Sequence, residues 1–544
     1  MAAELALAAY HGRPGRSKRR FRPFKAMIRS FLTVSTGTLA SRLLGFVRDS
    51  MIAALLGAGP VADAFLVAFQ MVNVVRRLLS EGALNAALVP AWLRLRETDG
   101  AAAAAAFAGK VLATISVALL ALSALIGLLM PLVLTALAPG FAGEETLKLA
   151  VGDARLMLPY LAFAGPSTVM LALYSAQSRF ALTAFSPLLF NIALIAVMIA
   201  LLPTRPEAGL VARALAATVG IAGFLQLLIL FSRRSGAIAS PLRVSLAADM
   251  RGFFARAIPG MVANAAPQLL IVGGAIIASS SPSAVSWLYF ANRLVELPLG
   301  IVGVAMGTVL VSELARAHRS SDAAVIAQAQ SHALELATGL ALPAMLGLAV
   351  LSEPIVRLLF EHGAFTAEDT RATAQALVWL ALALPAHVLT KALSPSFFAR
   401  EDTATPLTAS LVGLVVAMAA AFLLDRAFGA SGIAAGLALG AWTSTICLIR
   451  SGVAAFGFSL LPGTRGRLVR IAMAALLMAG LLDLATRLPG LHAPAHGLAQ
   501  ALALALLIGS AVAIYLFLLA LFGIGTWRQA VNAIQTGKPR DLRN

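Results

Sequence analysis

Charged side chains are scarce in this sequence. They make up 12% of its 544 residues, whereas an ordinary globular protein carries about 25%. Hydrophobic residues make up 60%, and the mean hydropathy is +0.88. A spanning helix needs roughly 20 mainly apolar residues, and such stretches recur from residue 28 to residue 522 with short breaks. The composition therefore excludes a series of soluble domains and predicts an all-α polytopic membrane protein.

Cysteine occurs only once, at Cys447, so neither a disulfide within the chain nor a cysteine-based metal site is expected. The histidines, such as His318, His387 and His492, lack the spacing of metal ligands. The phosphate-binding loop G-x-x-x-x-G-K-S/T is also missing, which argues against ATP hydrolysis by the chain itself. We therefore expect no metal, no cofactor and no enzymatic activity.

Acidic residues are outnumbered, with 24 Asp and Glu against 42 Lys and Arg and a net charge of +18. In a soluble protein this excess would suggest nucleic acid as a partner. Here the basic residues lie mainly between hydrophobic segments, so positive-inside topology explains them better and no nucleic-acid partner is expected. Residues 1–26 lack an apolar segment of their own, so we predict a basic cytoplasmic tail and not a cleaved signal peptide. Met27 is an alternative start.

Hydropathy predicts about fourteen spans. They run approximately over 28–57, 60–94, 106–137, 150–176, 181–203, 209–232, 252–279, 284–314, 328–352, 371–398, 404–425, 430–455, 468–487 and 498–523. If the N-terminus is cytoplasmic, the cytoplasmic loops are rich in arginine, whereas the opposite loops at 57–60 and 279–283 carry no charge. An even number of spans then places both termini in the cytoplasm.

The sequence also repeats itself. Residues 59–69 align with 281–291, residues 140–146 with 364–370 and residues 185–188 with 404–407, all at nearly one offset. Because each repeat holds an even number of spans, the two copies have the same orientation in the membrane. This predicts parallel six-helix bundles at 27–235 and 236–458, two extra helices at 459–525 and a cytoplasmic tail at 526–544.

Ionisable residues inside the predicted spans are functional candidates, because each costs at least about 2.5–3.5 kcal/mol at mid-membrane. The first span holds Arg42, Arg48 and Asp49, a net positive group. The span at 284–314 carries Tyr289, Arg293 and Glu296 on one helical face. The alternative for this second group is a purely structural ion pair between Arg293 and Glu296.

A polar stripe follows the span at 60–94. Its members are spaced by four or seven residues and are Asp63, Gln70, Asn73, Arg77 and Glu81. Such a stripe on an apolar helix faces a water-filled cavity. The alternative is that the span stops at Val75 and that Arg76 and Arg77 anchor it at the cytoplasmic surface. A basic pocket in an apolar transporter suggests an anionic substrate, and the planar arginine fork suits phosphate.

Six motifs resemble the MurJ/MviN family of bacterial lipid II flippases. They are SRLLGFVRD (41–49), GAG…ADAFLVAF (57–69), NVVRRLLSEGALNAALVP (73–90), YFANRLVELPLGIVGVAMGTVLVSELAR (289–316), LFEHGAFTAEDT (359–370) and KALSPSFFAREDTATP (391–406). The resemblance covers nearly the whole chain from Met27. It implies the fold of the MOP superfamily, with two six-helix bundles and, in addition, two extra helices that form a hydrophobic groove for the lipid tail. By their sequence alone the last two spans are simply apolar, as a lipid-facing scaffold would be.

The resemblance further implies that the substrate is lipid II, an undecaprenyl-pyrophosphate-linked disaccharide–pentapeptide. It would be flipped from the cytoplasmic to the periplasmic leaflet of the inner membrane for cell-wall synthesis, with membrane lipids and cell-wall synthesis proteins as further partners. The family's central-cavity arginines match Arg42, Arg48 and Arg293, its pair in the second span matches Arg76 and Arg77, and Asp49, Asp63 and Glu81 also fall on family positions. We expect these five arginines to bind the substrate, with Asp49, Asp63, Asn73, Glu81, Asn292 and Glu296 as supporting polar residues. Asn292 departs from relatives that carry an acid there.

Energy coupling is a second departure. Some relatives coordinate sodium in spans seven and eleven, but here span seven offers only Asn264 and Gln268, and span eleven only Asp425 at its end. Since a sodium site built of oxygen ligands usually includes a carboxylate, we expect the membrane potential to drive transport. Two alternatives to lipid II transport remain: an exporter of another polyprenyl-pyrophosphate glycan or of drugs, and a scaffold for cell-wall enzymes. Drug exporters of this superfamily typically lack the two extra spans, and intramembrane charges argue against a scaffold.

Overall fold

The computed structural model describes residues 21–524, apart from 81–82, 178, 205, 233–238, 246, 264–265, 321–322, 399, 401, 457–460 and 488–496. Within these ranges the regular elements are all helices, and no strand occurs. The expectation of an all-α polytopic membrane protein is therefore confirmed.

The helices follow the predicted spans in order. The first group consists of α2 (Phe21–Leu56), α3 (Pro60–Ser80), α4 (Ala83–Thr98), α5 (Gly100–Leu128), α6 (Met130–Leu137), α7 (Glu145–Met157), α8 (Pro159–Ala176), α9 (Phe180–Leu201) and α10 (Ala208–Ser232), with short 3-10 turns η1 (Pro139–Phe141) and η2 (Leu202–Thr204). The second group consists of α11 (Ala248–Ala263), α12 (Ala266–Ala278), α13 (Ala284–Ser320), α14 (Ala323–Val350), α15 (Ser352–Phe360), α16 (Ala367–Leu382), α17 (Leu384–Phe398) and α18 (Ala404–Phe456), followed by α19 (Thr464–Thr486) and α20 (Leu498–Leu521).

Nine helical stretches of the described chain are long and apolar enough to cross a membrane. One of them, residues 404–455, turns back on itself at Gly429, where φ is +52°. A Cβ atom on Gly440 would meet Ala417, which shows that the two arms of α18 pack closely against each other. This stretch therefore supplies two predicted spans. The other predicted spans are α2, α3 with α4, α11 with α12, and α13, and these carry most of the intramembrane charges.

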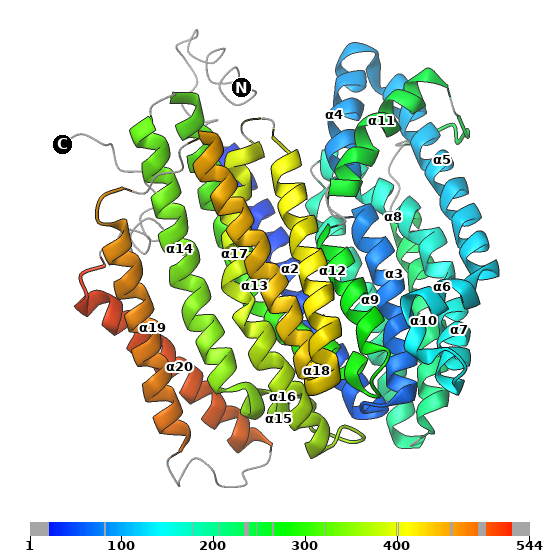
Figure 1. Cartoon of the computed structure of the whole chain (residues 1–544). Coiled ribbons are helices and arrows are strands. Elements are labelled where there is room, and N and C mark those ends of the chain that lie inside the picture. The colour runs from blue at the N-terminus through cyan, green and yellow to red at the C-terminus, as the bar shows by residue number, and fades with distance from the viewer. Residues whose placement is uncertain are drawn as a thin grey trace.

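The helices gather into two groups that meet along α3, α12 and α13 (Figure 1). In the first group α2 packs on α9, and α10 packs on α7, α8 and α9; in the second, α13 packs on α14 and α16, and α12 packs on α18. The last two helices lie outside this arrangement, with α19 against α14 and α20 against α19. Figure 1 also shows α11 beside α4 and α5, where Phe253 joins a cluster with Trp92 and Phe107. Part of the predicted second bundle thus packs on the first.

One end of the cavity between the groups is closed by contacts between their loops. The Ala364 amide donates a 2.8 Å hydrogen bond to the Ala54 carbonyl, joining the loop after α15 to α2. Gly57 has a φ of +66°, and a Cβ atom there would lie 2.5 Å from the Ala364 oxygen, so only glycine fits this turn. The sequence predicts, if the N-terminus is cytoplasmic, that these loops lie on the periplasmic side of the membrane.

Asp63 strengthens the same closed end. Its buried carboxylate accepts hydrogen bonds from the backbone amides of Ser283 and Ser286, at 2.8 and 2.9 Å, and from the Ser286 hydroxyl. The Ser286 amide belongs to the first turn of α13, where the helix has no partner of its own for it, and Ser283 directly precedes the helix. A residue of α3 therefore caps a helix of the other group, and the negative charge suits that end of the helix dipole.

Candidate substrate cavity

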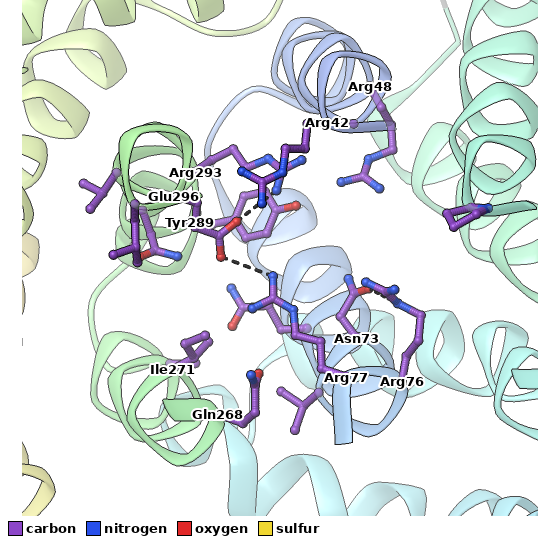
Figure 2. A pocket seen from close by; sticks show the side chains of 18 of the residues that line it. Arg42, Arg48, Asn73, Arg76, Arg77, Gln268, Ile271, Tyr289, Arg293 and Glu296 are labelled. Carbon is purple, nitrogen blue, oxygen red and sulfur yellow. Dashed lines mark hydrogen bonds and ion pairs between the residues drawn. The ribbon is translucent and has the colours of Figure 1, made fainter. Parts of the chain in front are cut away.

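A cavity of about 640 Å³ lies between the two groups of helices. All five arginines that the sequence singled out line it: Arg42, Arg48, Arg76, Arg77 and Arg293. Figure 2 shows that they converge from α2, α3 and α13. An apolar helix can hold these cations only if they face a protein interior or water, and the cavity provides such a place.

Asp49 is the first of two carboxylates that organise the arginines. It is fully buried, and its Oδ1 lies 2.5 Å from Arg48 Nη2 while its Oδ2 lies 2.6 Å from Arg293 Nε. The Tyr289 hydroxyl donates a further hydrogen bond of 3.2 Å to Oδ1. One carboxylate of α2 thus fixes a guanidinium on its own helix and a second one on α13.

Glu296 is the second shared carboxylate. Its Oε2 accepts a 2.9 Å hydrogen bond from Arg293 Nη1, and its Oε1 accepts one of 3.2 Å from Arg77 Nη2. Arg293 therefore contacts both carboxylates, and ion pairs run continuously from α2 through α13 to α3. Figure 2 shows the two contacts that Glu296 makes, with Arg293 and with Arg77. The pair of Arg293 and Glu296 is present, as the structural alternative proposed, but it lies in the cavity and connects to the other arginines.

Arg48 is held by residues that the sequence reasoning missed. Its Nη1 donates a 3.0 Å hydrogen bond to Asn191 Oδ1, and the Asn191 amide in turn donates to the Ser41 carbonyl at 3.2 Å. The rings of Phe69 and Phe190 lie 5.0 and 5.9 Å from the guanidinium carbon, within cation–π range. The one signal for Asn191 was its isolation as an amide in the otherwise apolar α9.

The remaining two arginines have no acidic partner within ion-pair distance among the residues that the structure describes. Arg76 Nε donates a hydrogen bond of 3.3 Å to Asn73 Oδ1. The Arg42 side chain extends from α2 to Gly300 of α13. Among the described residues, the carboxylates that accompany the five arginines are Glu296 in the lining and Asp49 behind it, so this described part of the site carries three more positive than negative charges. Such a site can bind a ligand group that carries several negative charges.

The other predicted polar residues are distributed unevenly. Gln70, Asn73 and Asn292 line the cavity with Glu296, as does Gln268. Asp63, which was expected to support the site, lies instead at the closed end and outside the cavity lining, because its partners are the amides that begin α13. Glu81 lies outside the described residues. Of the described members of the polar stripe predicted on the second span, Gln70, Asn73 and Arg77 line the cavity and Asp63 does not.

Of the residues considered for a cation, the structure describes Gln268, which lines the cavity, and Asp425. No group of three or more His, Cys, Asp or Glu side chains within the described ranges could hold a metal ion. Asp425 accepts hydrogen bonds from the hydroxyls of Ser280 and Ser281, at 3.2 and 3.1 Å. Asn264 lies outside the described residues.

Comparison with known proteins agrees with this geometry. Residues 52–489 match the family model described as "Lipid II flippase MurJ". This chain belongs to the MurJ family. A probable lipid II flippase MurJ of Rhizobium meliloti is 37% identical over 507 residues, which cover 92% of this chain and 94% of that protein. The lipid II flippase MurJ of Burkholderia cenocepacia is 30% identical over 469 residues, covering 84% and 89% of the two chains.

Solved structures support the fold of this MurJ family member. A lipid II flippase MurJ in an inward closed conformation covers 92% of this chain and 100% of its own, with a TM-score of 0.75 and 21% identity. An inward-facing multidrug transporter of the MATE family in the MOP superfamily covers 82% and 99%, with a TM-score of 0.64 and 15% identity. These likenesses show that the chain shares the fold of both structures, and the family match together with the apolar helices shows a multi-pass membrane protein of the lipid II flippase family.

Proposed function

We propose that this protein flips lipid II from the cytoplasmic to the periplasmic leaflet of the bacterial inner membrane, without catalysing a chemical reaction. The observation that carries the proposal is the convergence of five arginines in one cavity of a MurJ-family chain. A pyrophosphate group cannot cross hydrocarbon uncovered, since the transfer of an isolated ion costs tens of kcal/mol. The guanidinium forks replace the water of the head group with charge-assisted hydrogen bonds.

The contacts around the arginines suggest how a substrate is received. Arg42 and Arg76 have no acidic partner among the described residues, so an entering anion meets them without breaking an ion pair. Arg48, Arg77 and Arg293 are held in place by Asp49 and Glu296. Fixed cations lose little conformational freedom on binding, which favours affinity. The polyprenyl tail stays in the bilayer, where α19 and α20 offer an apolar surface outside the two bundles.

Alternating access requires the closed end to open while the opposite end shuts. At the closed end, the hydrogen bonds that join the groups in the described part of the chain include the Asp63 cap of α13, the bond between Ala364 and Ala54 and the bond from the Gly140 amide to Ser279 Oγ. In the proposed orientation, with both termini in the cytoplasm, this end faces the periplasm, and the substrate enters from the cytoplasmic leaflet while this end is closed. Rocking one bundle against the other then exposes the same arginines to the periplasm.

The membrane potential is the proposed driving force. Each charge that crosses the full field gains about 2.3 kcal/mol per 100 mV. The potential, negative inside, favours outward movement of an anionic head group, and it favours inward return of the emptied, positively charged cavity. Both halves of the cycle are thus driven in the right direction without a bound cation.

Rescue of growth tests the proposed function. The gene should sustain cells depleted of their own lipid II flippase, and variants with alanine at Arg48 and Arg293 together should not, although they reach the membrane. The second measurement is the amount of lipid II in the cytoplasmic leaflet, which should accumulate in the cells that are not rescued. If the wild-type protein inserts normally but neither restores growth nor lowers the accumulated lipid II, the assignment is wrong.

A further inference from the structure

Two glycines face two arginines across the contact between α2 and α13. A Cβ atom on Gly45 of α2 would lie 2.6 Å from Arg293 Nη2, and a Cβ atom on Gly300 of α13 would overlap Arg42 Nη1. Each helix therefore sends an arginine over a glycine of the other. Figure 2 shows the Arg42 and Arg293 side chains lying close together beside Glu296.

The arrangement follows from the directions of the helices and the spacing of the residues. The two helices run past each other in opposite directions (Figure 1). Arg42 and Gly45 are three residues apart and Arg293 and Gly300 are seven apart, so each pair shares one helical face. Along the helix axis the first pair is separated by about 4.5 Å and the second by about 10.5 Å. The length of the arginine side chains makes up this difference, so that the Arg42 guanidinium reaches Gly300 and the Arg293 guanidinium reaches Gly45.

The two glycines differ in what an added methyl group would displace. Arg293 is held at Nε by Asp49, at 2.6 Å, and at Nη1 by Glu296, at 2.9 Å, so it cannot move away from a Cβ atom on Gly45 without weakening these contacts. Arg42 has no such ion pair among the described residues, so it would swing aside from a Cβ atom on Gly300. A methyl group at Gly45 would therefore disturb the ion pairs of the site. A methyl group at Gly300 would displace the Arg42 guanidinium from its place and leave the packing nearly intact.

We propose that Gly45 and Gly300 are positioning residues of the substrate cavity. Each leaves free the space in which an arginine of the opposing helix is held for an anionic head group. This inference rests on the proposed function, because it names residues that place two of the proposed substrate-binding cations. It explains why α13 carries glycine one turn beyond Glu296, where a larger residue would fill the space of the Arg42 guanidinium.

Binding of undecaprenyl pyrophosphate to the purified protein tests the role of Gly300. The Gly300→Ala variant should bind this probe about ten- to a hundredfold more weakly, the loss expected for one charge-assisted contact. The matched control is Gly347→Ala, since a Cβ atom on this glycine of α14 meets nothing within 4 Å. Arg42→Lys should weaken binding in the wild-type background and add no further loss to Gly300→Ala. Equal losses from Arg42→Lys in both backgrounds would overturn the proposal.

Thermal unfolding provides a test that does not depend on the ligand. Gly45→Ala should lower the melting temperature when Arg293 is present and have little effect in an Arg293→Ala background. The control Gly152→Ala, on a glycine of α7 with open space around it, should change neither value. An equal effect of Gly45→Ala in both backgrounds would show that Gly45 acts without Arg293. If the wild-type protein binds no polyprenyl pyrophosphate, the proposed function fails, while this unfolding test still judges the contact of Gly45 with Arg293.

Discussion

Arg293 Nε and Asp49 Oδ2 lie 2.6 Å apart, and this ion pair joins α13 to α2 at the wall of the cavity, with Arg293 in the lining and Asp49 buried behind it. Asp49 also holds Arg48, and Arg293 also holds Glu296. The pair therefore has two effects: it fixes cations of the proposed substrate site, and it links the two groups of helices that alternating access must move.

Neutralising Asp49 should destabilise the protein. In Asp49→Asn the guanidiniums of Arg48 and Arg293 lose their buried partner, and breaking a buried pair in this way costs about 3–5 kcal/mol. The melting temperature of the purified variant measures the effect. Glu353→Gln is the matched control, because Glu353 pairs with Arg357 at 2.5 Å but is 46% exposed, and exposed pairs contribute about 0–1 kcal/mol. Equal melting temperatures for the two variants would contradict the role given to Asp49.

Removing the Asp63 carboxylate should open the closed end more often. Asp63→Ala loses hydrogen bonds from two backbone amides and a hydroxyl of α13, at a cost of about 1.5–3 kcal/mol, which corresponds to about a ten- to hundredfold shift toward the open state. The measurement is labelling of a cysteine at Ala278, a buried residue of the cavity lining. An impermeant thiol reagent added outside should modify Ala278→Cys faster when Asp63→Ala is present.

Asp425→Ala is the control for the opening of this end. Asp425 accepts hydrogen bonds from Ser280 and Ser281, but it lies on α18, which packs with α12 in the same group. Its loss breaks no contact between the groups and should leave labelling at Ala278→Cys unchanged. Equal acceleration by Asp425→Ala and Asp63→Ala would mean that the capping contact does not hold the groups together.

Topology can be tested with single cysteines after replacement of Cys447. Gly59→Cys and Ser280→Cys lie at the closed end and should react with an impermeant reagent added to the periplasm. Thr98→Cys, at the end of α4, should stay unlabelled until the cells are permeabilised. These results follow from a cytoplasmic N-terminus and an even number of spans. Labelling of Thr98→Cys in intact cells would overturn the orientation.

Varying the membrane potential and the sodium concentration independently tests which of the two drives transport. Collapse of the membrane potential at fixed sodium should stop flipping in proteoliposomes, because each transported charge loses about 2.3 kcal/mol per 100 mV. Removal of sodium at fixed potential should have no effect. The opposite pattern would show that a sodium site operates that the residues described around Asp425 do not reveal.

Much of the site could be predicted from the sequence because a charged side chain in an apolar span must face the protein interior or a water-filled cavity. Arg42, Arg48 and Arg293 had to face an interior, and their cavity follows from that requirement. Asp63 obeys the same rule but caps a helix that begins about 220 residues later, a contact that spacing within one helix cannot show. Asn191 and the glycines opposite the arginines depend in the same way on which helices lie side by side.

The measurement that tests the central claim most directly is transport of fluorescent lipid II by the purified protein in proteoliposomes. The wild-type protein should move the lipid between leaflets under a membrane potential, and Arg42→Ala, Arg48→Ala and Arg293→Ala should each abolish this movement, since each loses a charge-assisted phosphate contact of about 1.5–3 kcal/mol. Lysine should restore it only in part, because it lacks the guanidinium fork. Arg96→Ala, an exposed arginine that stacks on Trp92 outside the cavity, should transport normally. Transport at the wild-type rate by all three cavity variants would contradict the account.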